Sequence, residues 1–452
     1  MDTIKNKIKN SLSYYFDLLS EIESKFKVKA YIVGGAVRDA GIDEKVKDID
    51  IVIIPYRYNV SINLLELQTK KISPAQAFPV YIYTSDNPKY SNQQYELAIG
   101  RKEYKTGIGH KGFNIVPADD IYTDLLRRDF TINAIAIDKN GELHYPKDAL
   151  RDLEKRLLNP VVEKHFVEDP LRYYRALRFA TKGFSLTLRM INTLNNIPQY
   201  ELESIPNERI SNEMMKAFGG KYPERFFTCM ALLNNIPNKF QHIKKCLYVP
   251  SGRGEKHSDE RHLLDHLNKV LKLSTRLTND YNVRLAAFYH DIGKIFTDPK
   301  EYPRHYGHEQ NGYDFAIKWF KDMRFENKTV EIVSRACRYH MLIDNYYNLR
   351  LSKLIDIVSE NKYYIKELVM VSICDVDDER YEREVWDVFN LVLEVVNMKP
   401  SILIGEEKLK ELSRKNPENI RSLLKQRRVE ILKEKLLSDI KFSNYMIMQK
   451  VI

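Results

Sequence analysis

Apolar residues follow two different patterns along this chain. In roughly the first third they form short runs broken by glycines and polar segments, which predicts strands joined by tight turns. The clearest case is residues 30–54, where an apolar run at 31–33 meets two glycines and a second apolar run covers 49–54. We predict a strand, a tight turn, a helix and a second strand over this stretch.

The remaining elements of the first part follow from the same reasoning. Residues 3–26 gather apolar side chains on one face, which predicts a helix, while 78–83 and 95–103 predict two further strands. A glycine-rich loop covers 107–113. Beyond about residue 160 the apolar spacing is that of helices.

A chain of 452 residues is too long for a single core. We predict an α/β + α fold, in which a small mixed-sheet head is followed by a helical neck, a helical domain and a basic helical tail. We place these parts at residues 1–150, 151–250, 251–400 and 401–452.

The stretch at residues 30–54 carries the first candidate chemistry. Gly34 and Gly35 would let the backbone approach a phosphate closely, and Arg38 follows them. Asp48 and Asp50 are two apart, so on a strand both carboxylates point to one face and favour a shared cation such as Mg²⁺. A solvated acidic edge is the alternative, but the glycine pair and Arg38 upstream favour a nucleotide site.

A second candidate lies at residues 124–138. Arg127 and Arg128 can contact triphosphate oxygens, and we expect Asp129 to orient one of them. We interpret Asn133 as a structural hydrogen-bonding residue. Four apolar residues of this block are predicted to lie in the core: Phe130, Ile132, Ala134 and Ile135.

A third candidate lies on a helix predicted to open at Asp169 and Pro170. Asp169 and Arg172 are one turn apart and can read a base edge, since a carboxylate accepts from the cytosine amino group and a guanidinium contacts its acceptors. Helix capping with surface arginines is an equally good interpretation. We expect Glu213, on the helix predicted over 207–218, to brace this one.

Histidine and aspartate residues form a separate pattern later in the chain. Burying an Asp beside a His in an apolar helix is costly unless a metal compensates, and imidazole with carboxylate suits Mn, Fe, Ni or Zn. His257, His262 and His305 are weaker candidates, and Lys294 could contact a phosphate. Six residues resemble, in their order along the chain, the metal ligands of HD-domain phosphohydrolases, and this resemblance predicts the ligands His266, His290, Asp291, His308, His340 and Asp375.

Composition narrows the class of partner. The net charge is +10, which favours a polyanion such as nucleic acid, although a Lys-rich surface can also serve solubility alone. The four cysteines form no C-x-x-C pair, which is consistent with a reducing cytoplasm. We find no signal-peptide core and no apolar stretch of membrane-spanning length.

Several strings together resemble a known family. GGAVRD (34–39) followed by DID (48–50) is similar to the signature of the class II nucleotidyltransferases, which include CCA-adding enzymes and bacterial poly(A) polymerases. RRDFTINA (127–134) resembles a second motif of that family without a mismatch. HDIGK (290–294) and the loop at 107–113 look like those of the bacterial multifunctional CCA-adding enzymes, which carry an HD phosphohydrolase domain.

The resemblance implies template-independent addition of CCA to tRNA 3′ ends. Asp48 and Asp50 would hold Mg²⁺ as catalytic residues, and Gly34, Gly35, Arg38 and Arg128 would bind the triphosphate. Selection of CTP and then ATP would fall to Asp169, Arg172 and Arg175.

The same resemblance implies 2′,3′-cyclic phosphodiesterase, 2′-nucleotidase and phosphatase activities in the HD domain, with His290 and Asp291 catalytic. A transition metal such as Ni, Mn or Fe would serve there.

Two alternatives stay open, a poly(A) polymerase with a retained HD domain and an RNA end-healing phosphohydrolase. A monomer and a homodimer are both compatible with the sequence.

Overall fold

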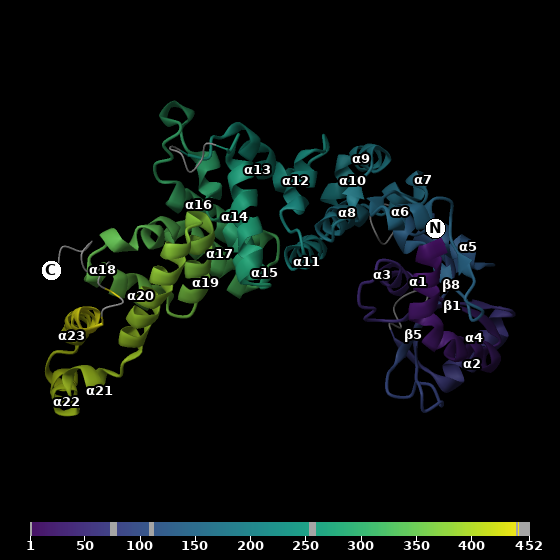
Figure 1. The fold of residues 1–452 in the computed structure, drawn as a ribbon, viewed down its shortest axis with the longest axis horizontal. Coiled ribbons are helices and arrows are strands. Elements are labelled where there is room, and N and C mark those ends of the chain that lie inside the picture. Colours follow the sequence, from purple (N-terminus) through teal and green to yellow (C-terminus); the bar gives the residue numbers. More distant parts are fainter. Residues whose placement is uncertain (1, 73–78, 108–112, 253–258, 440–441, 443–452) are drawn as a thin grey trace. The chain divides into compact units, whose positions relative to one another are not determined.

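The computed structural model describes residues 2–72, 79–107, 113–252, 259–439 and 442. The chain divides into two compact units (Figure 1). The first comprises Met1–Glu213 with Cys229–Lys239, and the second comprises Met214–Thr228 with Phe240–Ile452. The boundaries of neck and tail stay predictions.

A mixed seven-stranded sheet organises the first unit. Its strand order is β3-β4-β5-β2-β1-β8-β9. Strands β2 and β5 run parallel, and the other neighbouring pairs are antiparallel. The strands are β1 Val28–Val33, β2 Asp50–Pro55, β3 Lys70–Ile72, β4 Val80–Tyr83, β5 Tyr95–Ile99, β8 Ala136–Ile137 and β9 Leu143–His144. The predicted mixed sheet is confirmed, whereas the edge strand β3 was missed.

The sheet holds its first catalytic candidate at an exposed end. Strand β2 has one exposed residue, Asp50, followed by four buried ones. On one face, Tyr31 and Val33 pack with Val52 and Leu125 in a buried cluster. Burial of the strand interior therefore anchors the Asp50 carboxylate at the solvent boundary.

The helix predicted over residues 3–26 is divided in two. Helix α1 covers Asp2–Leu12, a 3-10 turn follows at Ser13–Tyr15, and α2 covers Phe16–Phe26. Both helices bury an apolar face, and this shared spacing of apolar residues is why the sequence pattern predicts a single helix.

The strand predicted over residues 95–103 also divides. Strand β5 ends at Ile99, and β6 (Arg101–Lys105) pairs instead with β7 (Phe113–Pro117). A Cβ on Gly100 would lie 2.3 Å from Ile54 Cδ1. Only glycine therefore fits at this point, where the chain leaves the sheet and passes close to Ile54. Most of the glycine-rich loop at 107–113 lies outside the described residues.

Helices complete the first unit and pass into the second. The base-reading helix predicted to open at Asp169–Pro170 begins at Leu171, whose N–H donates to Asp169 Oδ1 at 3.2 Å. The helices are α3 Gly35–Gly41, α4 Tyr58–Gln68, α5 Ile121–Leu126, α6 Ala149–Glu154, α7 Glu163–Glu168, α8 Leu171–Thr181, α9 Leu188–Asn195, α10 Gln199–Glu203, α11 Asn207–Phe218 and α12 Arg225–Ala231.

The second unit is helical, as predicted. Its elements are α13 Gln241–Lys245, α14 Leu263–Leu277, α15 Tyr281–Tyr289, the 3-10 helix η6 Ile292–Phe296, α16 His308–Asp322, α17 Asn327–Asp344, α18 Leu351–Asn361, α19 Ile365–Val376, α20 Glu379–Asn397, α21 Pro400–Ile404, α22 Glu406–Lys415 and α23 Pro417–Ser438. Among the described residues, no helix is long and apolar enough to cross a membrane.

A glycine allows two elements of this unit to pack closely. A Cβ on Gly293, in η6, would lie 1.9 Å from the carbonyl oxygen of His308 and 2.5 Å from the amide nitrogen of Gly312. Both atoms belong to the backbone of α16 and cannot move aside easily. Only glycine therefore lets η6, which follows His290 and Asp291, pack against the start of α16.

We expect Gly293→Ala to destabilise the second unit by at least about 1–3 kcal/mol, because an added methyl group overpacks a rigid contact. Differential scanning calorimetry would show a lower unfolding temperature. Gly219→Ala is the matched control, since its Cβ would meet the nearest backbone oxygens at 3.5 and 3.8 Å. Equal unfolding temperatures for the two variants would contradict this packing argument.

Candidate functional site

The turn after β1 brings two of the sequence motifs together. Gly34 has a φ of +66°, a conformation that residues with side chains rarely adopt. A Cβ there would lie 3.1 Å from Nη1 of Arg128. The guanidinium of Arg128 therefore lies against the glycine turn that leads into α3, which carries Arg38.

Three carboxylates gather at the start of β2. Asp50 is the first residue of the strand, while Asp48 lies just before it, and both are exposed. Glu96 on β5 is the register partner of Asp50. Partial desolvation and then the Glu96 carboxylate raise the pKa of Asp50, against the opposing effect of Arg128. Carboxylates that repel one another in this way suit a divalent cation.

Asp124 orients the two arginines of the second motif. Its buried carboxylate accepts from Arg127 Nη2 at 2.7 Å and from Arg128 Nη2 at 2.9 Å. Burial opposes its ionisation, but Arg128 and Arg127 more than offset this and lower the pKa of Asp124 to about 2. The expectation that Asp129 orients one of these arginines is wrong. Asp124, which lies about one helical turn before them on α5, makes these contacts instead.

Asp129 instead joins a buried chain of hydrogen bonds. Arg38 Nη1 donates to Asn133 Oδ1 at 2.8 Å, and Asn133 Nδ2 donates to Asp129 Oδ1 at 3.0 Å. Asp129 Oδ2 accepts from Arg175 Nη2 at 2.6 Å. Burial would raise the pKa of Asp129, but Arg175 and Arg172 lower it to about 2. The chain links the glycine turn to α8, with Asn133 in the structural role predicted for it.

The remaining base-reading candidates lie at the start of α8. Arg172 is buried and donates to the backbone oxygens of His165 and Arg127, both at 2.7 Å. Asp169 lies one turn before it. These contacts hold the Arg172 guanidinium in one orientation, with further donors left for another acceptor.

A cation missed by the sequence reasoning lies beside Phe179 on α8. The Nζ atom of Lys182 is 5.5 Å from the centre of this buried ring, and the guanidinium of Arg38 is 5.2 Å from it. Burial and then the charges of Arg38 and Arg178 lower the pKa of Lys182. Such a crowd of cations favours an anionic ligand. The sequence signal for Lys182 is its position four residues after Arg178. Arg178 itself forms an ion pair with Glu213, the residue predicted to brace this helix.

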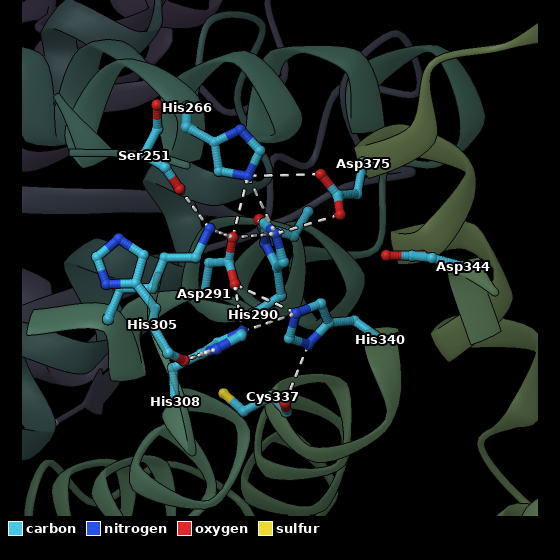
Figure 2. A network of polar contacts seen from close by, with 12 residues as sticks. Ser251, His266, His290, Asp291, His305, His308, Cys337, His340, Asp344 and Asp375 are labelled. Carbon is cyan, nitrogen blue, oxygen red and sulfur yellow. Dashed lines mark hydrogen bonds and ion pairs between the residues drawn. The ribbon is translucent and has the colours of Figure 1, made fainter. Parts of the chain in front are cut away.

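The second unit brings all six predicted His and Asp ligands together (Figure 2). One group, whose ligand atoms lie within 4.8 Å of one another, contains His266, His290 and Asp375, and the other contains Asp291, His308 and His340. The six residues are buried.

Asp291 joins the two groups through its two carboxylate oxygens. Oδ1 lies 3.1 Å from His308 Nε2 and 3.2 Å from His340 Nε2. Oδ2 lies 3.3 Å from His266 Nε2 and 3.4 Å from His290 Nε2. Burial opposes ionisation, but Lys294, 2.6 Å from Oδ2, and the neighbouring histidines hold the pKa of Asp291 well below its ordinary value.

The other ring nitrogens determine where the protons lie. The Nδ1 atoms of His290 and His308 face the carbonyl oxygens of Ala287 at 2.9 Å and His305 at 2.6 Å. The Nδ1 atom of His340 faces that of Cys337 at 3.0 Å. A carbonyl only accepts, so each Nδ1 carries the proton and each Nε2 lone pair points into the cluster.

This arrangement fits a metal. The Nε2 lone pairs of His308 and His340 cannot donate to Asp291 Oδ1, which is buried and has no hydrogen-bond partner among the described residues. A cation would satisfy all three atoms at once. Glu260, whose Oε1 lies 3.2 Å from His266 Nδ1, was missed by sequence reasoning, although it lies only six residues upstream.

The weaker histidine candidates lie outside the cluster. His305 is held by Thr297 Oγ1 at 2.8 Å and by the carbonyl oxygen of Pro250 at 2.9 Å, so both of its ring nitrogens are engaged. His262 precedes α14 and faces Asp265 at 3.7 Å. His257 lies outside the described residues.

Comparison with known proteins matches two parts of the chain to families. Residues 30–159 match the Poly A polymerase head domain, and residues 263–378 match the HD domain. The multifunctional CCA protein of Shewanella denitrificans is 32% identical over 346 residues, covering 75% of this chain and 80% of that protein. The one of Nitrosococcus oceani is 32% identical over 338 residues, covering 74% and 79%.

Solved structures support the fold. The CCA-adding enzyme of Bacillus stearothermophilus in complex with CTP has a TM-score of 0.65 at 17% identity, and the match covers 98% of both chains. The CCA-adding enzyme of Thermotoga maritima complexed with tRNA has a TM-score of 0.61 at 18% identity, covering 94% of both.

The fold and the sites define a nucleotidyltransferase head followed by an HD phosphohydrolase domain. Within that class, the chain belongs to the family of multifunctional CCA proteins. The family resemblance and the fold class predicted from the sequence are both confirmed.

We expect Asp129→Asn to destabilise the first unit by about 2 kcal/mol at neutral pH. The pKa of Asp129 falls from its ordinary value of 3.8 to about 2 on folding, at about 1.36 kcal/mol per unit. Because the folded pKa is depressed, this stabilisation is present above pH 4 and is lost as the pH falls towards 2.

Urea unfolding of the wild type and Asp129→Asn between pH 2 and pH 7 measures this effect. The two unfolding free energies should converge as the pH falls to about 2. A difference that does not depend on pH would show that Asp129 acts through packing alone.

Proposed function

We propose that this protein adds and repairs the 3′-terminal CCA of tRNA with CTP and ATP, and that its HD domain hydrolyses phosphate esters. The observation that carries the first proposal is the hydrogen-bonded chain from the buried Arg38 through Asn133 and Asp129 to the partly exposed Arg175. It ties the candidate triphosphate site to the candidate base-reading helix, as an enzyme that selects nucleotides without a template requires.

In the head, Asp48 and Asp50 would hold Mg²⁺, and Glu96, the register partner of Asp50, would add a third carboxylate. Mg²⁺ bound there supplies charge stabilisation and lowers the pKa of the attacking RNA hydroxyl. Gly34, Gly35 and Arg38 bind the triphosphate, together with Arg128 and Lys182. Their positive charges stabilise the leaving pyrophosphate.

On α8, Asp169, Arg172 and Arg175 select the base. A carboxylate accepts from the exocyclic amino group of cytosine or adenine, and a guanidinium donates to the neighbouring ring acceptors. Uracil and guanine present the opposite polarity. Their binding would leave polar groups unpaired at about 1–3 kcal/mol each.

In the HD domain, the cluster around Asp291 holds a transition metal such as Ni, Mn or Fe. A metal bound there would activate a water for attack on a phosphate ester. Lys294, held 2.6 Å from Asp291, lies where it can contact a phosphate oxygen. The substrates proposed are 2′,3′-cyclic phosphates, 2′-nucleotides and simple phosphate monoesters. Because the proposed partners are tRNA, CTP and ATP, we expect the protein to act in the cytoplasm.

We expect Asp50→Asn to reduce nucleotide transfer to tRNA by at least about a thousandfold, because one Mg²⁺ ligand loses its charge. Hydrolysis of 2′,3′-cyclic AMP by the same preparation should be unchanged. Incorporation of labelled CMP and release of 2′- or 3′-AMP measure the two activities. Retained transfer would contradict the proposed role of Asp50.

The reciprocal variant is His290→Ala. It should abolish phosphohydrolysis and weaken Ni²⁺ binding, measured by calorimetry, while leaving CMP transfer intact. His262→Ala is the matched control, since His262 lies outside the cluster. If His290→Ala kept its metal and its phosphohydrolase activity, the proposed HD site would be wrong.

A further inference from the structure

Three exposed aromatic side chains come from segments that touch the HD cluster. Tyr248 is 75% exposed, Phe296 is 46% exposed and Tyr306 is 64% exposed. An isolated exposed aromatic side chain needs no explanation. Three such side chains on segments that meet beside one metal-binding cluster do call for one.

Hydrogen bonds tie these three segments together. The carbonyl oxygen of Pro250 lies 2.9 Å from His305 Nε2, and that of Ser251 accepts from Lys294 Nζ at 2.5 Å. Thr297 Oγ1 lies 2.8 Å from His305 Nδ1. In Figure 2, Ser251 and His305 lie on the side of the cluster away from Asp344. The segments at 248–251, 294–297 and 305–308 therefore meet on one side of the site.

The sequence spacing places the backbone of two of these aromatic residues close to residues of the site. Tyr306 lies between His305 and His308, so its Cα is at most about 7.6 Å from that of the ligand His308. Phe296 is two residues from Lys294. Ser251, Lys294 and His308 of these segments are buried, whereas the three aromatic side chains are exposed.

Positive charge accompanies these rings. The Nζ atom of Lys245 lies 6.0 Å from the centre of the Phe296 ring. Arg304 is exposed and makes no ion pair with any residue that the structure describes. Aromatic rings interleaved with unpaired cations are typical of surfaces that bind single-stranded nucleic acid, in which bases stack and phosphates meet Lys or Arg.

We propose that Tyr248, Phe296 and Tyr306 form a stacking platform for the terminal nucleotides of a single-stranded RNA 3′ end. Lys245 and Arg304 hold its backbone while the terminal phosphate reaches the HD cluster. The inference rests on the proposed phosphohydrolase function and identifies its preferred substrates as nucleotides and RNA ends, in preference to phosphate esters without a base.

Steady-state kinetics of the metal-loaded, full-length protein test this platform. The substrates are 2′-AMP and glycerol 2-phosphate, which has no base. Tyr306→Ala should raise the KM for 2′-AMP by about tenfold relative to its effect on glycerol 2-phosphate, with little change in kcat. Tyr306→Phe should restore the KM, because stacking needs the ring and not the hydroxyl.

Tyr363→Ala is the matched control, since Tyr363 is 78% exposed in the same unit but outside these segments. Its KM values should equal those of the wild type. Equal effects of Tyr306→Ala on both substrates, or none on either, would overturn the platform while leaving the phosphohydrolase proposal intact.

Binding of 2-aminopurine riboside 2′-phosphate, followed by its fluorescence, tests the platform without relying on turnover. Stacking should quench the base in the wild type and less so in Tyr306→Ala. If the wild type hydrolysed neither ester, the proposed function would fail, and this binding difference would still decide the platform. Equal quenching in both proteins would contradict it.

Discussion

A buried carboxylate must be matched by positive charge, and this constraint organises both units of the protein. Asp124 and Asp129 are buried in the head, and each meets its requirement with arginines. Asp291 is buried in the HD domain, where Lys294 is the one Lys or Arg that forms an ion pair with it among the described residues. The charges of Asp124 and Asp129 are therefore balanced by other protein side chains, whereas the residues around Asp291 are suited to bind a metal.

The same constraint connects structure with chemistry. In the head, fixing Arg128 through Asp124 and Arg175 through Asp129 removes the rotational freedom of long side chains before any nucleotide binds. In the HD domain, backbone carbonyls fix the tautomers of His290, His308 and His340, so that their Nε2 lone pairs point into the cluster. Each site is preorganised by groups that do not themselves touch a substrate.

Much of this could be predicted from the sequence, because the motifs are local. The two apolar runs and the glycines between them predict the strand, tight turn, helix and second strand that carry Gly34, Arg38 and Asp50. The six predicted HD ligands, which the structure brings together, follow from their order along the chain.

Pairings between side chains could not be predicted in the same way. Asp124 and Asp129 are both near Arg128 in sequence, and only the course of the chain after α5 decides which one contacts it. Lys182 and Glu260 acquire their surroundings only on folding, and the break at Gly100 depends on its contact with Ile54.

The most direct test of the account is extension of a tRNA transcript lacking CCA, with CTP and ATP supplied separately and together. The account predicts two C residues with CTP alone and then one A, after which extension stops. Long A tails with ATP alone would contradict it.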